Sequence, residues 1–303
     1  MLAGMRPLRG IVMAAGTGSR LAPVTLGVSK HLLPVYDKPM VFYPLSVLML
    51  AGVRDVLLIT TKDDLPAYQR VLGQGDHLGM DIRYAIQQQP GGIAEAFHIG
   101  RDFIGSDPVS LVLGDNIFYG HAFTPMLQKA RATNTGATLF AHAVHDPRRF
   151  GVVSFDADGA VQGLVEKPQN PASQYAVTGL YFFSADVVDV AVSIAPSARG
   201  EREIIDVLEV YRQQGRLQAQ LLGRGFTWLD AGTPDSLLEA SMFVQAVEHR
   251  QGMKIACLEE IAWNAGWINA QTLLTRLDQL RGTPYGRYLD CVLNGQGGGG
   301  QST

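Results

Sequence analysis

The stretch GIVMAAGTGSRLAPVTLGVSK, residues Gly10 to Lys30, decides how this chain can fold. It begins with GIVMA, a short apolar run of the kind that forms a buried strand. The small residues AAGTGS follow at once, and Arg20 and Lys30 lie on the same connection. Small residues let backbone N–H groups come close to an anion, so this loop predicts binding of a phosphate-bearing ligand.

The bulk properties narrow the class of protein. The chain has 303 residues, a formal net charge of −3, 47% hydrophobic residues and 17% charged residues, which fits a soluble globular protein. Its mild acidity and scattered basic residues favour neither nucleic acid nor an anionic membrane as a partner. The apolar stretch FYPLSVLMLAG ends at Gly52, too soon to span a membrane. Cys257 and Cys291 are interpreted as thiols of a cytoplasmic protein.

The first half of the chain alternates between short apolar runs, typical of buried strands, and amphipathic stretches, typical of helices. We predict strands at 9–14, 55–61, 82–88 and 109–115, and helices at 44–52, 64–73 and 93–105. Strands and helices that alternate at this spacing indicate βαβ units and a parallel sheet.

The second half is richer in strands and then becomes helical. Strands are predicted at 137–144, 151–156, 159–168, 175–184, 216–223 and 226–232, and helices at 201–215 and from Pro234 to Gly252. Asp158-Gly159 is a hairpin turn signal. We expect a core over 9–250 that includes an insertion, a helical segment over 251–292, and a disordered low-complexity tail over 293–303.

Three kinds of glycine-rich loop compete for the first connection. The spacing of a Walker A loop is absent, and a dinucleotide fingerprint would need a third glycine where Leu21 stands. Asp37 has the spacing of a ribose-binding acid but lies between two prolines. The remaining interpretation is a polyphosphate loop with its own cations, in which Arg20 grips oxygens bidentately and Lys30 acts as a point charge. Solvated loop residues are the plainer alternative.

Two acids follow apolar strands in distant parts of the chain. Asp115 ends VSLVLGD, and Asp230 ends FTWLD. Ligands of open α/β sheets bind beyond the carboxyl ends of the strands, and two carboxylates there suit Mg²⁺. The alternative is that each acid caps a turn or a helix. Glu166 and Lys167 end a further apolar run and add an acceptor and a cation, unless they form an ordinary surface turn.

These motifs occur in an order that resembles a known family. The segments AAGTGSRLAPVT, SKHLLPVYDKPM, LGDN, RRFGVV, VEKP, YAVTGLYFF, ARGE and WLDAGT are similar to those of bacterial glucose-1-phosphate thymidylyltransferases, within the sugar nucleotidyltransferase superfamily. The resemblance covers about residues 9–290. It implies a Rossmann-like, three-layer α/β fold with a mixed central sheet and a helical C-terminal part.

The resemblance also implies a reaction and its residues. The reaction would join dTTP to glucose 1-phosphate with Mg²⁺, giving dTDP-glucose and pyrophosphate, in a typically tetrameric enzyme. The catalytic positions would be Arg20, Lys30, Asp115, Lys167 and Asp230, with Asp115 and Asp230 on the metal. Nucleotide binding would add Ala15, Gly16, Thr17, Gly18, Ser19 and, at the base, Gln87 and Gly92. Sugar-phosphate binding would use Asn116, Gly151, Glu166, Lys167, Val177 and Arg199, with Glu201 nearby.

The chain departs from the family pattern at several of these places. Ala15 replaces a glycine and Ser19 a threonine of the loop, while Phe150 stands for tyrosine and Ile205 and Ala231 for threonines. Near the base, positions 88, 89, 91 and 95 differ. The phosphate chemistry is left in place, but the choice of base and sugar stays open. The alternatives are the same chemistry with UTP or another sugar phosphate, a non-catalytic sugar-nucleotide sensor, and an NAD(P)-dependent oxidoreductase.

Overall fold

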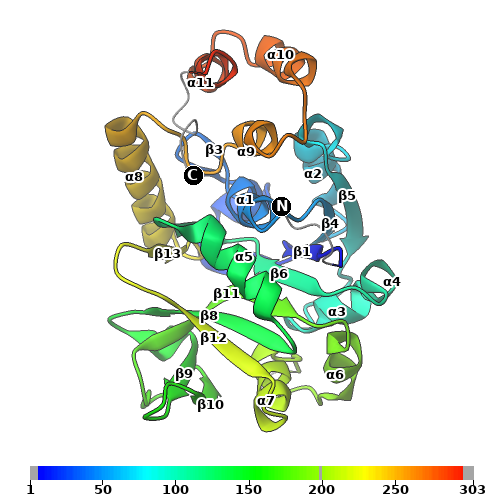
Figure 1. The fold of residues 1–303 in the computed structure, drawn as a ribbon, viewed down its shortest axis with the longest axis vertical. Coiled ribbons are helices and arrows are strands. Elements are labelled where there is room, and N and C mark those ends of the chain that lie inside the picture. The colour runs from blue at the N-terminus through cyan, green and yellow to red at the C-terminus, as the bar shows by residue number, and fades with distance from the viewer. Residues whose placement is uncertain (1–5, 198–199, 296–303) are drawn as a thin grey trace.

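The computed structural model describes residues 6–197 and 200–295. Within them, strands run in the order β10-β9-β11-β6-β1-β4-β5 in the central sheet, and β8 and β12 extend it beside β11 (Figure 1). The strands are β1 (Arg9–Met13), β4 (Asp55–Thr60), β5 (Asp81–Ile86), β6 (Val109–Leu113), β8 (Ala137–Ala143), β9 (Gly151–Phe155), β10 (Val161–Glu166), β11 (Tyr175–Phe183) and β12 (Leu217–Leu222). The predicted α/β class with a mixed sheet is confirmed.

The parallel part of the sheet comes from the first half of the chain. β1 pairs in parallel with β4 and with β6, and β4 with β5. Nearly all residues of β1, β4 and β6 are buried, as expected of strands covered on both faces. The predicted βαβ pattern is thus present in the structure.

The antiparallel part begins at β11, which joins the two halves of the sheet. β11 runs antiparallel to β6 on one side and to β8 on the other, with a further contact to β9. β9 and β10 form the hairpin expected around Asp158-Gly159, with Gly159 at φ +83°. β12 pairs in parallel with β8.

Helices cover both faces of the sheet. One face packs against α1 (Phe42–Leu50), α2 (Leu65–Leu72) and α5 (Phe123–Thr133), and the other against α3 (Glu95–Ile99), α4 (Arg101–Ile104), α6 (Val187–Ser193) and α7 (Ile204–Gln213). The helix α9 (Leu258–Asn264) packs on α1, and α10 (Ala270–Gln279) and α11 (Pro284–Leu293) extend the first core beyond it. Along β1, Val12 belongs to the first core and Ile11 to the second. Adjacent strand residues point to opposite faces, so the fold has three layers. No described helix is both long enough and apolar enough to span a bilayer.

One predicted helix is divided in the structure. The segment 93–105 was expected to be continuous, but it contains α3 and α4 with a break at Gly100. A Cβ at Gly100 would lie 3.2 Å from Ile11 Cδ1 and 3.3 Å from Leu57 Cδ2. The chain therefore bends where glycine lets it approach the sheet closely, which apolar periodicity alone does not reveal.

The long helix α8 (Pro234–Gln251) has clear end signals. The Thr233 hydroxyl accepts from the Ser236 amide, the Ser236 hydroxyl accepts from the Thr233 amide, and Gly252 at φ +68° ends the helix. In Figure 1 this helix lies to one side of the sheet, while α10 and α11 lie at the end opposite β9 and β10.

A buried ion cluster ties α8 to the chain near the first loop. Lys38 lies on β3 (Lys38–Pro39), which pairs with β2 (Pro34–Val35). Its ammonium is 2.8 Å from a Glu248 carboxylate oxygen, and their side chains are only 1% and 5% exposed. Asp37 and Lys254 complete the cluster. Since each charge is buried with opposite charges, removing one partner leaves the others uncompensated.

We expect the Lys38→Met substitution to lower the free energy of unfolding by about 3 kcal/mol, because Asp37 and Glu248 would share the single cation Lys254. Urea denaturation followed by circular dichroism measures the change. The matched control is Lys62→Met, at an exposed position, which should shift the midpoint little. Equal shifts in the two variants would contradict a stabilising role for the cluster.

Candidate active site

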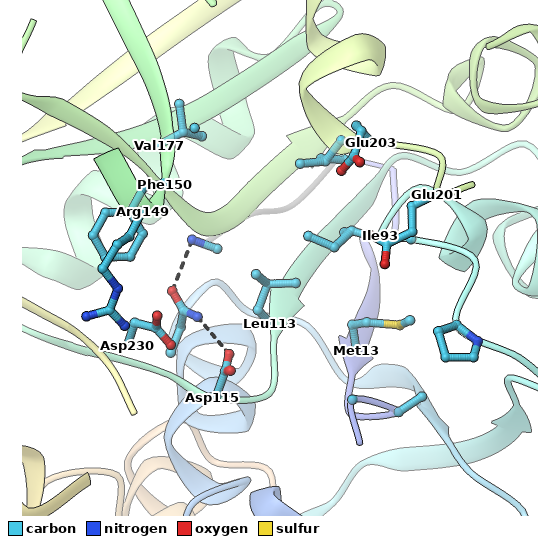
Figure 2. A pocket seen from close by; sticks show the side chains of 18 of the residues that line it. Met13, Ile93, Leu113, Asp115, Arg149, Phe150, Val177, Glu201, Glu203 and Asp230 are labelled. Carbon is cyan, nitrogen blue, oxygen red and sulfur yellow. Dashed lines mark hydrogen bonds between the residues drawn. The ribbon is translucent and has the colours of Figure 1, made fainter. Parts of the chain in front are cut away.

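A cavity of about 700 Å³ opens beyond the carboxyl ends of β1 and β6, where ligands of α/β sheets bind (Figure 2). The predicted site residues Ala15, Gly16, Thr17, Ser19, Arg20, Lys30, Gln87, Gly92, Asp115, Asn116, Gly151, Glu166, Lys167, Val177 and Asp230 all line it, as does Glu201. Gly18 lies in the same loop but not in the lining, and Arg199 lies outside the described residues. The structure therefore brings together residues as far apart in the sequence as Ala15 and Asp230.

Glycines in the first loop let the Lys30 side chain pass beneath it. A Cβ at Gly16 would lie 3.1 Å from Lys30 Cε, and one at Gly18 3.0 Å from Lys30 Cβ. Gly18 also has φ +63°, a conformation that favours glycine. Lys30 thereby reaches Asp115, where its ammonium donates to a carboxylate oxygen at 2.5 Å.

Asp115 is held ionised and fixed in orientation. Burial raises the pKa of this carboxyl, but the charge of Lys30, the neighbouring His31 and the hydrogen bonds from Lys30 and Asn116 together outweigh burial and lower the pKa to about 2. Asn116 donates its Nδ2 hydrogen to the other carboxylate oxygen at 3.0 Å. The Asn116 Oδ1 atom accepts from the Gly179 amide at 3.1 Å and from the Trp228 indole at 2.5 Å. This network gives Asn116 only one possible amide orientation.

A small antiparallel sheet delivers Asp230 to the same place. β7 (Asn116–Tyr119) was not predicted; it pairs with β13 (Thr227–Asp230), in register with Asp230 opposite Asn116. The Ala231 amide then donates to the Asp115 carbonyl at 3.0 Å. Asp115 and Asp230 consequently lie at one side of the cavity, with Arg149 beside Asp230 (Figure 2).

The electrostatics of Asp230 match a cation site. Burial first, and the charge of Asp115 second, raise the pKa of Asp230, while Arg20, Lys30 and Arg149 oppose the shift. Two buried carboxylates that repel each other are stabilised by a hard divalent cation, and Mg²⁺ characteristically takes one or two protein carboxylates. The donor set therefore fits Mg²⁺ completed by oxygens of a ligand and water. No group of three or more His, Cys, Asp or Glu side chains suited to a metal occurs in the described part of the chain.

The end of the cavity near β9 and β10 is tightly packed. A Cβ at Gly151 would lie 2.6 Å from Ile205 Cδ1 and 3.3 Å from Glu166 Oε2. The Lys167 ammonium is 3.0 Å from a Glu166 oxygen, and its side chain is 48% exposed toward the opening. Val177 on β11 lies at this end too (Figure 2). The result is a small compartment with an acidic group and a half-exposed cation at its edge.

The opposite end is formed by the connection after β5. Gln87 is 7% exposed, and its backbone N–H donates a hydrogen bond to the Thr60 carbonyl at 2.9 Å. The following turn is bound to the segment before α7, since Arg202 N donates to Gly91 O at 2.9 Å and Ala94 N to Arg202 O at 3.2 Å. Gly92 has φ +90°, and a Cβ there would lie 2.3 Å from Arg202 O.

Known proteins are similar to this chain in sequence over nearly its whole length. The nucleotidyl transferase family model matches residues 9–247. The glucose-1-phosphate thymidylyltransferase of Neisseria gonorrhoeae is 54% identical over 93% of this chain and 98% of its own length. The enzyme of that name from Mycobacterium tuberculosis is 52% identical over 93% of this chain and 98% of its own length.

The chain belongs to the glucose-1-phosphate thymidylyltransferase family.

Solved structures of this enzyme class agree with the assignment. A Bacillus anthracis structure described as a glucose-1-phosphate thymidylyltransferase in complex with sucrose has a TM-score of 0.73 and 37% identity, covering 78% of this chain and 94% of that one. A UDP-glucose pyrophosphorylase matches with a TM-score of 0.70 over 80% of this chain and 99% of that one, at 23% identity, and so shows the fold alone.

Several lining residues of this family member were not predicted from the sequence. Arg149, Tyr181 and Glu203 line the cavity, and Arg149 lies near Asp230. Arg149 precedes Phe150, and its guanidinium lies 5.9 Å from that ring. The motif RRFGVV was noticed for its resemblance, yet nothing in it tells which arginine faces the cavity, because η5 (Pro147–Arg149) sets that direction.

We expect Gly92→Ala to lower the free energy of unfolding by about 1–3 kcal/mol more than Gly159→Ala does. Both glycines have similar positive φ, +90° and +83°, so both variants carry the backbone strain. Only the new methyl group at 92 meets the Arg202 carbonyl, whereas no atom lies within 4 Å of one at 159. Chemical denaturation of the two variants measures the difference. Equal losses of unfolding free energy would contradict the prediction, because they would mean that the Arg202 carbonyl moves away from the new methyl group without destabilising the protein.

Proposed function

We propose that the protein transfers a deoxythymidylyl group from dTTP to α-D-glucose 1-phosphate, releasing pyrophosphate and forming dTDP-glucose, the first step toward dTDP-deoxysugars. The observation that carries this proposal is the convergence of Arg20, Lys30 and Lys167 around the Asp115–Asp230 pair in one cavity. Three cations and a carboxylate pair suit two phosphorylated substrates that must approach each other. The names of the close relatives supply the choice of base and sugar.

The reaction is an in-line displacement at the α-phosphorus. An oxygen of the sugar phosphate forms the new P–O bond, and the bond to the bridging oxygen breaks with its electron pair leaving on pyrophosphate. Such a reaction depends chiefly on positioning and on charge stabilisation. Arg20, on the first loop, would bind the departing phosphates bidentately. Lys167, half-exposed at the end of the cavity near β9 and β10, would neutralise the incoming sugar phosphate.

Asp115 and Asp230 would hold Mg²⁺ in this scheme. Bound there, the ion would supply Lewis-acid stabilisation of the charge that develops on the phosphate oxygens. Lys30 contacts Asp115 directly, so its ammonium would be available for the triphosphate when a metal ion neutralises that carboxylate. Asn116 would keep the Asp115 carboxylate in place, because its own oxygen already accepts two hydrogen bonds.

The remaining assignments follow the resemblance. The first loop and Gln87 with Gly92 would bind nucleotide, and Asn116, Gly151, Glu166 and Val177 the sugar, with Arg199 alongside. We further propose a cytoplasmic homotetramer. The division into a core over 9–250, a helical segment over 251–292 and a tail over 293–303 stays a proposal. The structure has α9 and α10 within the second of these ranges, and α11 runs one residue past its end, to Leu293.

Pyrophosphate release tests the proposed function directly. With Mg²⁺ and glucose 1-phosphate, dTTP should be used in preference to UTP, CTP, ATP and GTP, because the similar proteins are named thymidylyltransferases. A coupled phosphate assay measures the rates. Comparable rates with UTP would show relaxed base and ribose choice, which the departures at 88, 89, 91 and 95 would explain. Nucleotide binding with no release from any triphosphate would favour a sensor.

Removal of single charges should separate chemistry from folding. Arg20→Ala and Asp115→Asn should each lower kcat by about a hundred- to a thousandfold, because each removes one preorganised electrostatic group. Steady-state kinetics measures the loss, and circular dichroism verifies the fold. Arg70→Ala, at an exposed position of α2, is the control and should keep normal turnover. Near-normal turnover in either site variant would rule out the role given to that residue.

A further inference from the structure

We propose that Glu95 is a positioning residue that selects the base by fixing the side-chain amide of Gln87. This inference rests on the proposed function and deepens it. It concerns the base end of the cavity, where Gln87, Pro90 and Gly92 contribute to the lining. Glu95 is not part of that lining; it is the first residue of α3 and lies behind Gln87.

The contact between the two side chains is direct. Gln87 Nε2 donates to Glu95 Oε2 at 2.5 Å, and Glu95 is half-buried. An ionised carboxylate only accepts hydrogen bonds, so only the NH₂ group of Gln87 can face it. The carbonyl oxygen Oε1 is thereby directed away from Glu95, and no protein partner for it occurs among the described residues. The orientation follows from chemistry alone, as it does for Asn116.

The fixed amide presents a definite pattern to a base. Its Oε1 can accept one hydrogen bond, and the second hydrogen on Nε2 can donate one. Thymine and uracil offer the complement, an N3–H donor beside the O4 acceptor. Cytosine offers the reverse, an N3 acceptor beside an amino donor. Gln87 could serve cytosine only after a flip that would place Oε1 against the Glu95 carboxylate.

Position 91 provides the space that Glu95 requires. A Cβ at Gly91 would lie 2.2 Å from Glu95 Oε2 and 2.6 Å from its Cδ. The turn cannot simply move away, because its backbone is hydrogen-bonded to Arg202 on both sides of Gly92. Glycine at 91 and glutamate at 95 are both departures from the family pattern in the sequence, and in the structure they form a single feature.

The cost of a wrong base should therefore depend on Glu95. In the wild type, binding of cytosine would either turn Gln87 Oε1 toward the Glu95 carboxylate or leave two buried polar groups without a hydrogen bond. Sites built to accept a hydrogen bond from a substrate strongly reject analogues that lack the donor. A glutamine at 95 can either accept or donate, so it would satisfy both orientations of Gln87 equally.

The test compares dTTP with dCTP, both with glucose 1-phosphate and Mg²⁺, in the wild type and in Glu95→Gln. The ratio of kcat/KM for dTTP over dCTP should fall about tenfold or more in the variant, chiefly through a lower KM for dCTP. Glu95→Met, which also removes the fixed acceptor but keeps a long side chain suited to a helix, should lower the ratio likewise. Glu239→Gln, at an exposed position of α8, is the matched control and should leave the ratio unchanged.

The outcomes separate this inference from the proposed function. A ratio within about twofold of the wild type in Glu95→Gln, or equal losses with dTTP and dCTP, would overturn the positioning role. Equal losses would mean that Glu95 serves only to hold the turn. If the wild-type protein releases no pyrophosphate from dTTP at all, the proposed function itself fails, and that result is read before any variant is compared.

Discussion

The site depends on one backbone contact, the hydrogen bond from the Gly114 amide to the Met13 carbonyl at 2.9 Å. It continues the parallel pairing of β1 with β6 by one step beyond their ends. A Cβ at Gly114 would lie 2.8 Å from that carbonyl and 2.6 Å from the His31 ring, so the two strand ends can come this close only with glycine there. The join places the cation-bearing loop after β1 and the Asp115 carboxylate after β6 at one edge. Without this hydrogen bond, the cations of the first loop and the Asp115 carboxylate would not face the same ligand.

The charges at that edge are then mutually dependent. Lys30 lowers the pKa of Asp115, Asp115 raises that of Asp230, and the Asn116 amide is fixed by β11 and the Trp228 indole. The Asp115 carboxylate is oriented by Lys30 and Asn116, and the pairing of β13 with β7 places Asp230 beside it, so the geometry exists before a substrate arrives. Preorganisation of this kind is the main source of catalytic power in phosphoryl transfer, where the transferred group itself needs little covalent help.

Much of this organisation could be predicted from the sequence, for physical reasons. Buried parallel strands appear as continuous apolar runs, so β1, β4 and β6 and the residues that follow them were found together with Arg20, Lys30 and Asp115. The break at Gly100 was missed because it depends on the closeness of the sheet, and β7 because it is short and pairs only with the distant β13. Arg149 was missed, and Glu95 was noted only as a departure near the base, because the contacts of both side chains are made across space. Local periodicity does not encode such contacts.

The three-layer arrangement also has a consequence for how such a protein can change over generations. Ala15, Gly91, Phe150 and Ala231 lie on connections, Ser19 begins the short 3₁₀ helix η1 (Ser19–Leu21), and Glu95 and Ile205 lie in the first turns of helices at the cavity. None of these departures falls on a strand of the central sheet, whose two hydrophobic cores carry most of the apolar burial. Ala15 and Ile205 nevertheless belong to the second hydrophobic core, and Ala231 is fully buried in a smaller third cluster. Substitutions at these positions therefore alter core packing beside the cavity as well as the cavity wall, while the strands of the sheet keep their own packing.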